Sequence, residues 1–147
     1  MAWFDRALAV LFLVAVANGV LLSLPEAFGV PVAPDSPWPP LRALHHWAVT
    51  QEPAHLDPPP TLRASLWFDA LVQTPFAVVL SWALWTGRRW IRTPALVYAG
   101  AAIANMYFYF FQTVHGPTPP LDPAVYWPAN LPWLVLPAVL AVRFWRP

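Results

Sequence analysis

The chain has 147 residues, of which 59% are hydrophobic, 16% aromatic and only 10% charged. Soluble domains carry about 25% charged residues, so this composition excludes an ordinary soluble enzyme and indicates a membrane protein. Because the chain has no cysteine and a net charge of +1, it has no disulfide framework, no thiolate metal site and no basic patch of the kind that binds nucleic acid.

Four apolar stretches are long enough to cross a bilayer, which takes about 20 helical residues. We place these helices at residues 7–24, 64–86, 93–114 and 124–142. The sequence therefore predicts an all-α, polytopic membrane protein, in which a four-transmembrane-helix bundle forms a single domain over residues 1–147.

The first helix is expected to end at Pro25, because proline lacks the N–H that continues a helix. A segment at residues 25–62 follows it and holds ten of the twenty prolines. A structureless loop of this length is uncommon. We therefore expect a proline-rich outer cap loop over the mouth of the bundle, with a short interfacial helix at residues 39–48.

The fourth helix contains three prolines, Pro128, Pro132 and Pro137. Proline removes a backbone hydrogen bond and kinks helices. This helix is therefore predicted to be bent or partly unwound.

The distribution of the arginines predicts how the protein is oriented in the membrane. Six of the eight lie on one side of the predicted bundle: Arg6, Arg88, Arg89, Arg92, Arg143 and Arg146. Positive charge is retained in the cytoplasm, so both termini are expected there. Aromatic residues that favour interfaces support the borders, with Trp82, Trp85, Trp90 and Trp145 on the inner side and Tyr126 and Trp127 on the outer side. In a bacterium the membrane would be the inner membrane, and in a eukaryote that of the endoplasmic reticulum.

All four predicted helices carry polar side chains in their outer halves, whereas the inner halves hold nothing more polar than Ser81, Thr93 and Tyr98. Residues three, four and seven apart share one face of a helix. This spacing groups three sets: Asp69, Gln73 and Phe76; Tyr98, Asn105 and Tyr109; and Asn130 and Trp133. Together with Asn18 of the first helix, they predict one largely apolar pocket with a few polar groups, as small-molecule sites are built.

Asp69 carries the strongest signal for function. A charged carboxyl group in the middle of a membrane helix costs about 2.5–3.5 kcal/mol on insertion scales, so such residues are rarely kept without a role. We expect Asp69 to bind a ligand or exchange protons. The structural alternative is a protonated or amide-paired aspartate that fixes helix packing.

The histidines of the cap carry a weaker signal. His45, His46 and His55 lie near Glu52 and Asp57, but their spacing matches no standard metal site. We expect solvated, interfacial histidines and no metal. Glu52 could close the pocket from above. The alternative interpretation is that Glu52 is a loop residue exposed to solvent.

Three motifs resemble those of the EXPERA superfamily, which includes sigma-2-receptor-type proteins and emopamil-binding-protein-type sterol isomerases. Residues 90–95 (WIRTPA) are similar to the start of the third helix of the receptor type. Asp69, Gln73 and Pro75 resemble its acid-x-x-x-Gln-x-Pro pattern, and residues 130–137 (NLPWLVLP) resemble the Asn-x-x-Trp-x-x-x-Pro helix of the isomerases.

This resemblance implies a four-helix membrane bundle with a lipid-accessible pocket for sterol-like or cationic amphiphilic molecules. Asp69 would take the position of the acid in helix two, and Asn130 and Trp133 those of a pocket pair. Glu52, followed by Pro53, would match an acidic step in the cap.

The chain departs from both family patterns in its first helix. The His-x-x-x-Glu pair of the isomerases falls on Val14 and Asn18, and neither of these can relay a proton. For the acid that the receptor type has near the outer end of this helix, the chain offers Ser23 or Glu26.

The function we favour is binding of a hydrophobic sterol-like or cationic amphiphilic ligand in an occluded pocket, with Asp69 as its polar anchor. An alternative is a sterol or isoprenoid double-bond isomerase that uses Asp69 as acid and base, with Glu52 or His115 as a second group. A third is an interaction or chaperone bundle without a ligand. The expected partners are the bilayer and a hydrophobic small molecule or lipid, with a homodimer left open, and no cofactor is expected.

Overall fold

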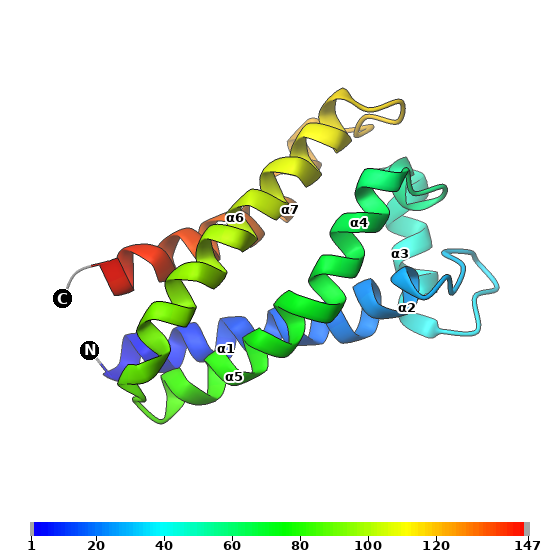
Figure 1. Cartoon of the computed structure of the whole chain (residues 1–147). Helices are drawn as coiled ribbons and strands as arrows, with labels where there is room; N and C mark the ends of the chain where they lie inside the picture. Colours follow the sequence, from blue (N-terminus) through cyan, green and yellow to red (C-terminus); the bar gives the residue numbers. More distant parts are fainter. Residues whose placement is uncertain (1, 146–147) are drawn as a thin grey trace.

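The computed structural model describes residues 2–145. Its elements are all helical, and four helices are long and apolar enough to cross a membrane (Figure 1). They cover Trp3–Ala27, Pro60–Trp85, Arg89–His115 and Pro123–Trp145. The predicted all-α, four-span fold is confirmed, and each span begins before its predicted start.

The first two spans are each interrupted by a π-helical turn. In the first span, α1 (Ala2–Asn18) leads into the π turn η1 (Gly19–Ser23) and then α2 (Leu24–Ala27). In the second, α4 (Pro60–Phe68) leads into the π turn η3 (Asp69–Gln73) and then α5 (Thr74–Trp85).

The last two spans are regular, and the cap contains two helical elements. The third span consists of a 3₁₀ turn, η4 (Arg89–Ile91), and α6 (Arg92–His115), and the fourth is α7 (Pro123–Trp145). In the cap, the predicted interfacial helix is α3 (Pro39–Thr50), and a 3₁₀ turn, η2 (Pro53–His55), follows it.

The first helix does not end at Pro25, so this prediction is wrong. Pro25 lies in the first turn of α2. The missing N–H of Pro25 would have bonded the carbonyl group of Leu21 in an α-helix. That carbonyl oxygen instead accepts a hydrogen bond from the indole Nε1 of Trp38 at 2.7 Å. A cap side chain thus replaces the lost bond and ties the cap to the first span.

The fourth helix is not partly unwound, because α7 is α-helical through all three of its prolines. Each proline removes one backbone bond and leaves its neighbours in place. The helix also packs along the length of α6, which supports it.

The four spans pair by packing, α1 against α5 and α6 against α7. The first and fourth spans lie close together where both termini are and diverge toward the cap (Figure 1). There a bidentate ion pair joins Asp5 to Arg143, at 2.8 and 3.0 Å. The largest cluster of buried apolar residues, which includes Leu8, Phe12 and Leu140, fills the same half of the bundle.

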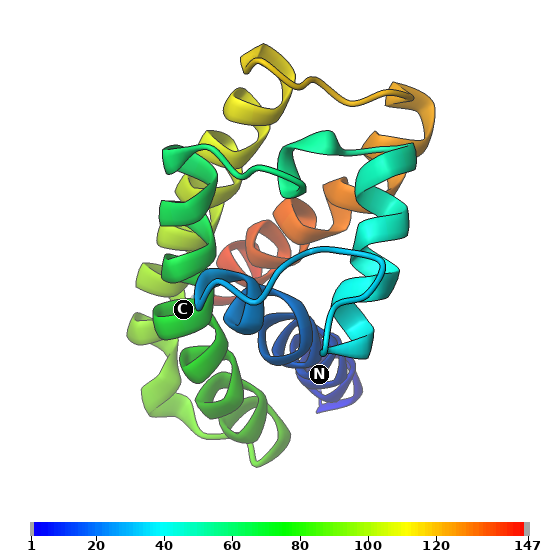
Figure 2. The ribbon, with the colours of Figure 1, turned by 90° about the vertical axis from the view of Figure 1, so that its right-hand side faces the viewer.

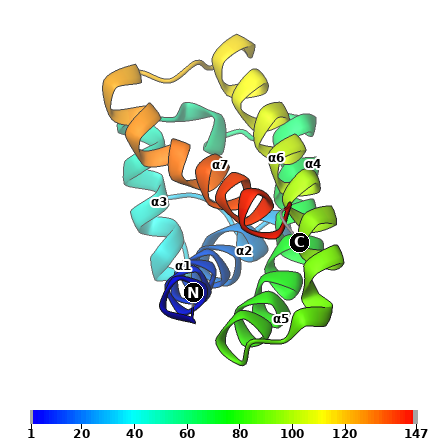
Figure 3. The same ribbon diagram turned by 90° about the vertical axis from the view of Figure 1, so that its left-hand side faces the viewer.

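The cap covers the diverging end of the bundle. Helix α3 runs between the first span and the start of α7, as Figures 2 and 3 show from opposite sides. The N–H of Leu121, in the loop before α7, donates to the carbonyl oxygen of Gln51 at 2.9 Å. The cap is therefore an ordered layer that is joined to both sides of the opening.

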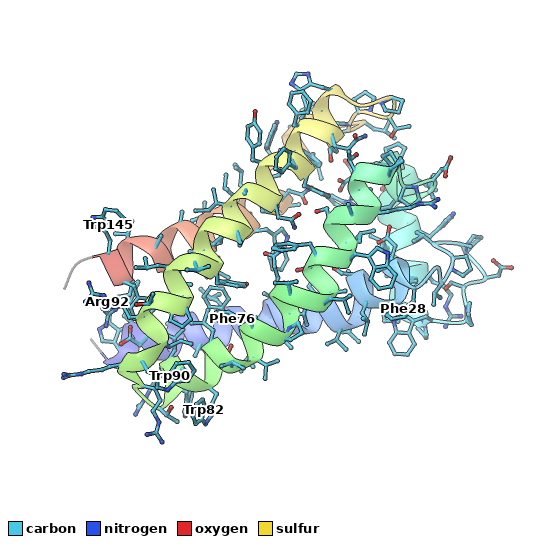
Figure 4. All side chains as sticks on the ribbon, in the orientation of Figure 1. Phe28, Phe76, Trp82, Trp90, Arg92 and Trp145 are labelled. Carbon is cyan, nitrogen blue, oxygen red and sulfur yellow. The ribbon has the colours of Figure 1, made fainter. Side chains whose placement is uncertain are left out.

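Exposed tryptophans surround the end that holds the termini, and Trp82, Trp90 and Trp145 project outward there (Figure 4). Tyr126 departs from its prediction as an interfacial residue, because it is fully buried. Its ring packs edge to face with those of Phe110 and Trp127. Arg146 lies outside the described residues.

Candidate functional site: a cavity beneath the cap

A cavity of about 670 Å³ lies where the spans diverge. All four spans and the cap contribute side chains to it, and most of these are apolar, such as Leu22, Leu66, Met106 and Leu136. Ligand pockets in proteins typically measure about 300–1,000 Å³ and have this mixture of apolar walls and a few polar groups.

The structure brings nine of the ten predicted site residues to this cavity: Asn18, Glu52, Asp69, Gln73, Tyr98, Asn105, Tyr109, Asn130 and Trp133. They come from η3 and α6, from the first and fourth spans and from the cap. The polar layer of the four helices therefore meets in one space.

Phe76 is the predicted residue that does not line the cavity. The prediction assumed a regular α-helix from Asp69 to Phe76, but the π turn η3 lies between them. One extra residue in a turn rotates everything after it by about 100°, which moves Phe76 off the cavity face. Its ring instead stacks on that of Tyr98, a cavity residue, with centroids 4.8 Å apart.

The two π turns set the position of Asp69. Gly19 of η1 lies against Thr74, so close that a Cβ atom on Gly19 would come within 1.8 Å of the Thr74 Oγ1 atom. This contact holds the first two spans together beside the cavity. Ser23 and Asp69 both line the cavity, and among the described residues no cationic side chain forms an ion pair with Asp69.

The asparagines of the cavity make hydrogen bonds within the bundle. Asn105 Oδ1 accepts from the Ser65 hydroxyl group at 2.9 Å, which links α6 to α4. Asn130 Nδ2 donates to the carbonyl oxygen of Tyr126 at 3.1 Å. These amides are thus held in place, and each keeps further polar atoms that can face a ligand.

A second acidic group lies under the cap, where Glu52, Glu26 and His55 meet. Glu52 is 1% exposed. Its carboxylate accepts hydrogen bonds from the indole Nε1 of Trp47 at 3.1 Å and from the hydroxyl group of Tyr109. All of these side chains line the cavity. Glu52 is therefore a buried cavity residue and not a solvated one.

His55 lies between the two glutamates. Its Nδ1 atom is 2.8 Å from Glu26 Oε1, and its Nε2 atom is 3.8 Å from Glu52 Oε2. His55 and Glu26 are each only 8% exposed. Burial lowers the pKa of the imidazole, but the hydrogen bond to Glu26 and the charges of both glutamates outweigh burial and raise it above its ordinary value. A protonated His55 can thus serve both carboxylates as their cation.

The expectation that the cap histidines are solvated is therefore wrong for His55, and neither Glu26 nor His55 was among the predicted site residues. One signal was present: Glu26 lies just beyond the first apolar stretch, at the depth where the receptor-type pattern has its acid. No comparable signal marks His55, because its burial depends on how the cap folds back over the bundle.

The remaining histidines lie elsewhere. His115, considered as a second proton-transfer group, is exposed at the end of α6, with its ring against Phe111. His45 and His46 do not line the cavity. Within residues 2–145, no three His, Asp or Glu side chains are grouped so that they could hold a metal ion.

Comparison with known families agrees with this architecture. The model of the family EBP, EXPERA (EXPanded EBP superfamily), matches residues 40–144, from the cap helix to the end of α7. No individual curated protein matches the chain. The matched region contains Glu52, His55, Asp69 and Asn130, whereas Glu26 and the first span precede it.

Proposed function

Since the chain belongs to the EXPERA superfamily and is an integral membrane protein with four apolar spans, we propose that its cavity binds a hydrophobic, sterol-like or cationic amphiphilic molecule. The family supports a hydrophobic ligand. The observation that carries the proposal is the cavity itself, in which apolar walls from all four spans surround a small set of buried polar groups.

Asp69 is the polar anchor in this proposal. It lines the cavity, as does Ser23. Among the described residues, no cationic side chain forms an ion pair with Asp69. Glu26 and Glu52, by contrast, already have His55 between them. A positive charge on a ligand would therefore find its best partner at Asp69, with Gln73, Asn105 and Asn130 nearby to orient the polar end and Trp133 and Tyr109 as walls.

The substitution Asp69→Asn tests this role, because it removes the charge and keeps the shape. The probe is a long-chain alkyl trimethylammonium, which is charged at every pH, and the protein is held in lipid nanodiscs. We expect at least a tenfold loss of affinity, corresponding to about 1.4 kcal/mol. Asp57→Asn is the matched control, since the Asp57 side chain is 99% exposed. Unchanged affinity in Asp69→Asn would remove the anchor role.

Native mass spectrometry of the protein extracted with its own lipids identifies the natural ligand class. A single bound sterol, hopanoid, carotenoid or quinone is the expected outcome. Protein that carries no lipid and also fails to bind the ammonium probe would favour the interaction or chaperone bundle.

A double-bond isomerase is the second candidate, and the buried Glu26–His55–Glu52 cluster is the observation that favours it. Such a reaction adds a proton to one alkene carbon and removes another from a carbon next to the resulting carbocation, with no net oxidation. It needs proton-transfer groups at two points of the cavity. Asp69 and the His55 cluster are two such groups, whereas His115 lies outside. Incubation with a panel of sterols, followed by NMR of the products, should reveal a shifted double bond.

We further propose that both termini face the cytoplasm. The described arginines Arg6, Arg88, Arg89, Arg92 and Arg143 lie at the end of the bundle that holds the termini, and positive charge marks the cytoplasmic side. The chain has no cysteine, so single introduced cysteines report accessibility. A membrane-impermeant maleimide should label Asp57→Cys in intact cells and label Arg88→Cys only after permeabilisation. The reverse pattern would invert the orientation.

A further inference from the structure

The cavity contains three acidic side chains but a single described basic one. Glu26, Glu52 and Asp69 line it together with His55. The acids have unequal surroundings, because two of them contact the imidazole and the third does not. This asymmetry bears on which ligand charges the cavity accepts.

We propose that His55 is a specificity-determining residue, which acts as the internal cation of Glu26 and Glu52 and so restricts the cavity to a single ligand cation, bound at Asp69. The proposal rests on the proposed function, since it concerns the ligand of the same cavity. It assigns a role to a residue for which the sequence motifs give none.

The contacts of the two glutamates support this role. Glu26 has the His55 ring nitrogen at 2.8 Å. Both oxygen atoms of Glu52 accept hydrogen bonds from the chain's own donors, Tyr109 on one and Trp47 on the other. A ligand ammonium group that approached this pair would meet satisfied acceptors and the positive charge of a protonated imidazole. To bind either glutamate, it would have to compete with the imidazolium, and loss of the His55 proton would remove this competitor.

The groups that face His55 come from several elements. Glu26 belongs to α2 and Glu52 precedes η2, whereas Tyr109 of α6 contacts Glu52 directly and Tyr126 of α7 lies near it. Asp69 of η3 lines the same cavity. The tyrosines are neutral donors in the physiological range. His55 is therefore the group whose protonation can change the cavity's charge without disturbing the anchor.

Loss of the imidazolium has a defined consequence. Without it, Glu26 and Glu52 form a pair of buried carboxyl groups with no cation, and such a pair attracts an external one. The cavity would then gain a second cation site that does not depend on Asp69.

The double variant Asp69→Asn with His55→Gln tests this consequence in nanodiscs with the alkyl trimethylammonium probe. The proposed function predicts that Asp69→Asn alone binds the probe weakly. If His55 occupies the glutamate pair as its cation, adding His55→Gln restores affinity by at least tenfold. The matched control adds His46→Gln instead, since His46 is an exposed cap histidine outside the cavity, and it should restore nothing.

A pH titration of Asp69→Asn alone provides a test that needs no change at His55. Binding at the glutamate pair must expel one proton, so the affinity of the probe should rise by about tenfold per pH unit until His55 is neutral and then level off. The matching long-chain alcohol has no charge, and its affinity should not follow this slope.

The failures of the two proposals are distinguishable. If neither probe binds the wild type at any pH, the ligand cavity itself is refuted, and this inference with it. If the wild type binds the ammonium and Asp69→Asn does not, but the double variant and high pH both fail to restore binding, the role of His55 is overturned and that of Asp69 stands.

Discussion

The contact between Gly19 of η1 and Thr74, the first residue of α5, predicts that Gly19→Ala separates the first two spans. A Cβ atom at position 19 would lie 1.8 Å from Thr74 Oγ1, 2.9 Å from its Cβ and 3.0 Å from its Cγ2, whereas ordinary contact begins at 3.4 Å. Rotation of the threonine side chain can remove the hydroxyl contact. It cannot move the Thr74 Cβ atom, so the backbone of one span must give by several tenths of an ångström.

The expected cost follows from two opposing terms. Overpacking a close contact costs about 1–3 kcal/mol. Replacing glycine by alanine within a helix returns about 0.5–1 kcal/mol. The net destabilisation should therefore be up to about 2.5 kcal/mol, which corresponds to a fall in melting temperature of up to about 10 °C for a chain of this size.

Thermal unfolding in detergent, followed by near-ultraviolet circular dichroism, measures this effect. Gly100→Ala is the matched control, because a Cβ at Gly100 of α6 meets nothing within 4 Å, and it should raise the melting temperature. Adding Thr74→Ala to Gly19→Ala should recover part of the loss, since it removes two of the three close atoms. If Gly19→Ala melts at or above the wild type, the close packing of Gly19 against Thr74 is refuted.

Three further predictions concern the charged groups. The pKa of His55 is raised in the folded state, so its ionic contacts stabilise the fold below about pH 6.5 and are lost as pH rises through that raised pKa. The melting temperature of the wild type should therefore fall as pH rises from about 6.5 through the pKa of the folded state. His55→Gln should not show this fall. Trp47→Phe removes one hydrogen-bond donor to Glu52 and should lower the free energy of unfolding in urea by about 1.5–3 kcal/mol. An unchanged urea midpoint would mean that the indole hydrogen bond does not stabilise the fold. Asp5→Asn removes the partly exposed ion pair with Arg143 and should cost about 1 kcal/mol. Because about 1 M salt screens this pair in the wild type, it should reduce the difference in stability between the two proteins.

The sequence was sufficient for the four spans because their signal is local. Length and hydropathy mark each helix, and a membrane allows few alternatives to a helical span. The same reasoning predicted the cap and its helix, and it placed the polar layer at one depth. Those polar residues do share a cavity, although their role as ligand-binding residues stays a prediction.

The features that the sequence did not predict depend on contacts between distant segments. No local pattern marks the π turns, and the close contact of Gly19 with Thr74 joins two segments that are far apart in the sequence. The helix continues past Pro25 because Trp38, from the cap, supplies the missing donor. His55 is buried because the cap folds over the cavity. Its neighbours in the sequence predicted a solvated side chain, which is wrong for the folded protein.

The paired π turns also have an evolutionary consequence. Each turn holds one residue more than a regular helix needs at that point, so it behaves as a single-residue insertion that was absorbed without breaking the span. Deleting a residue from only one span would rotate its outer half against a partner that had kept its own extra residue. We therefore expect homologous chains to gain or lose the two insertions together. In a sequence alignment, this would appear as one-residue gaps that occur in both spans of the same chain.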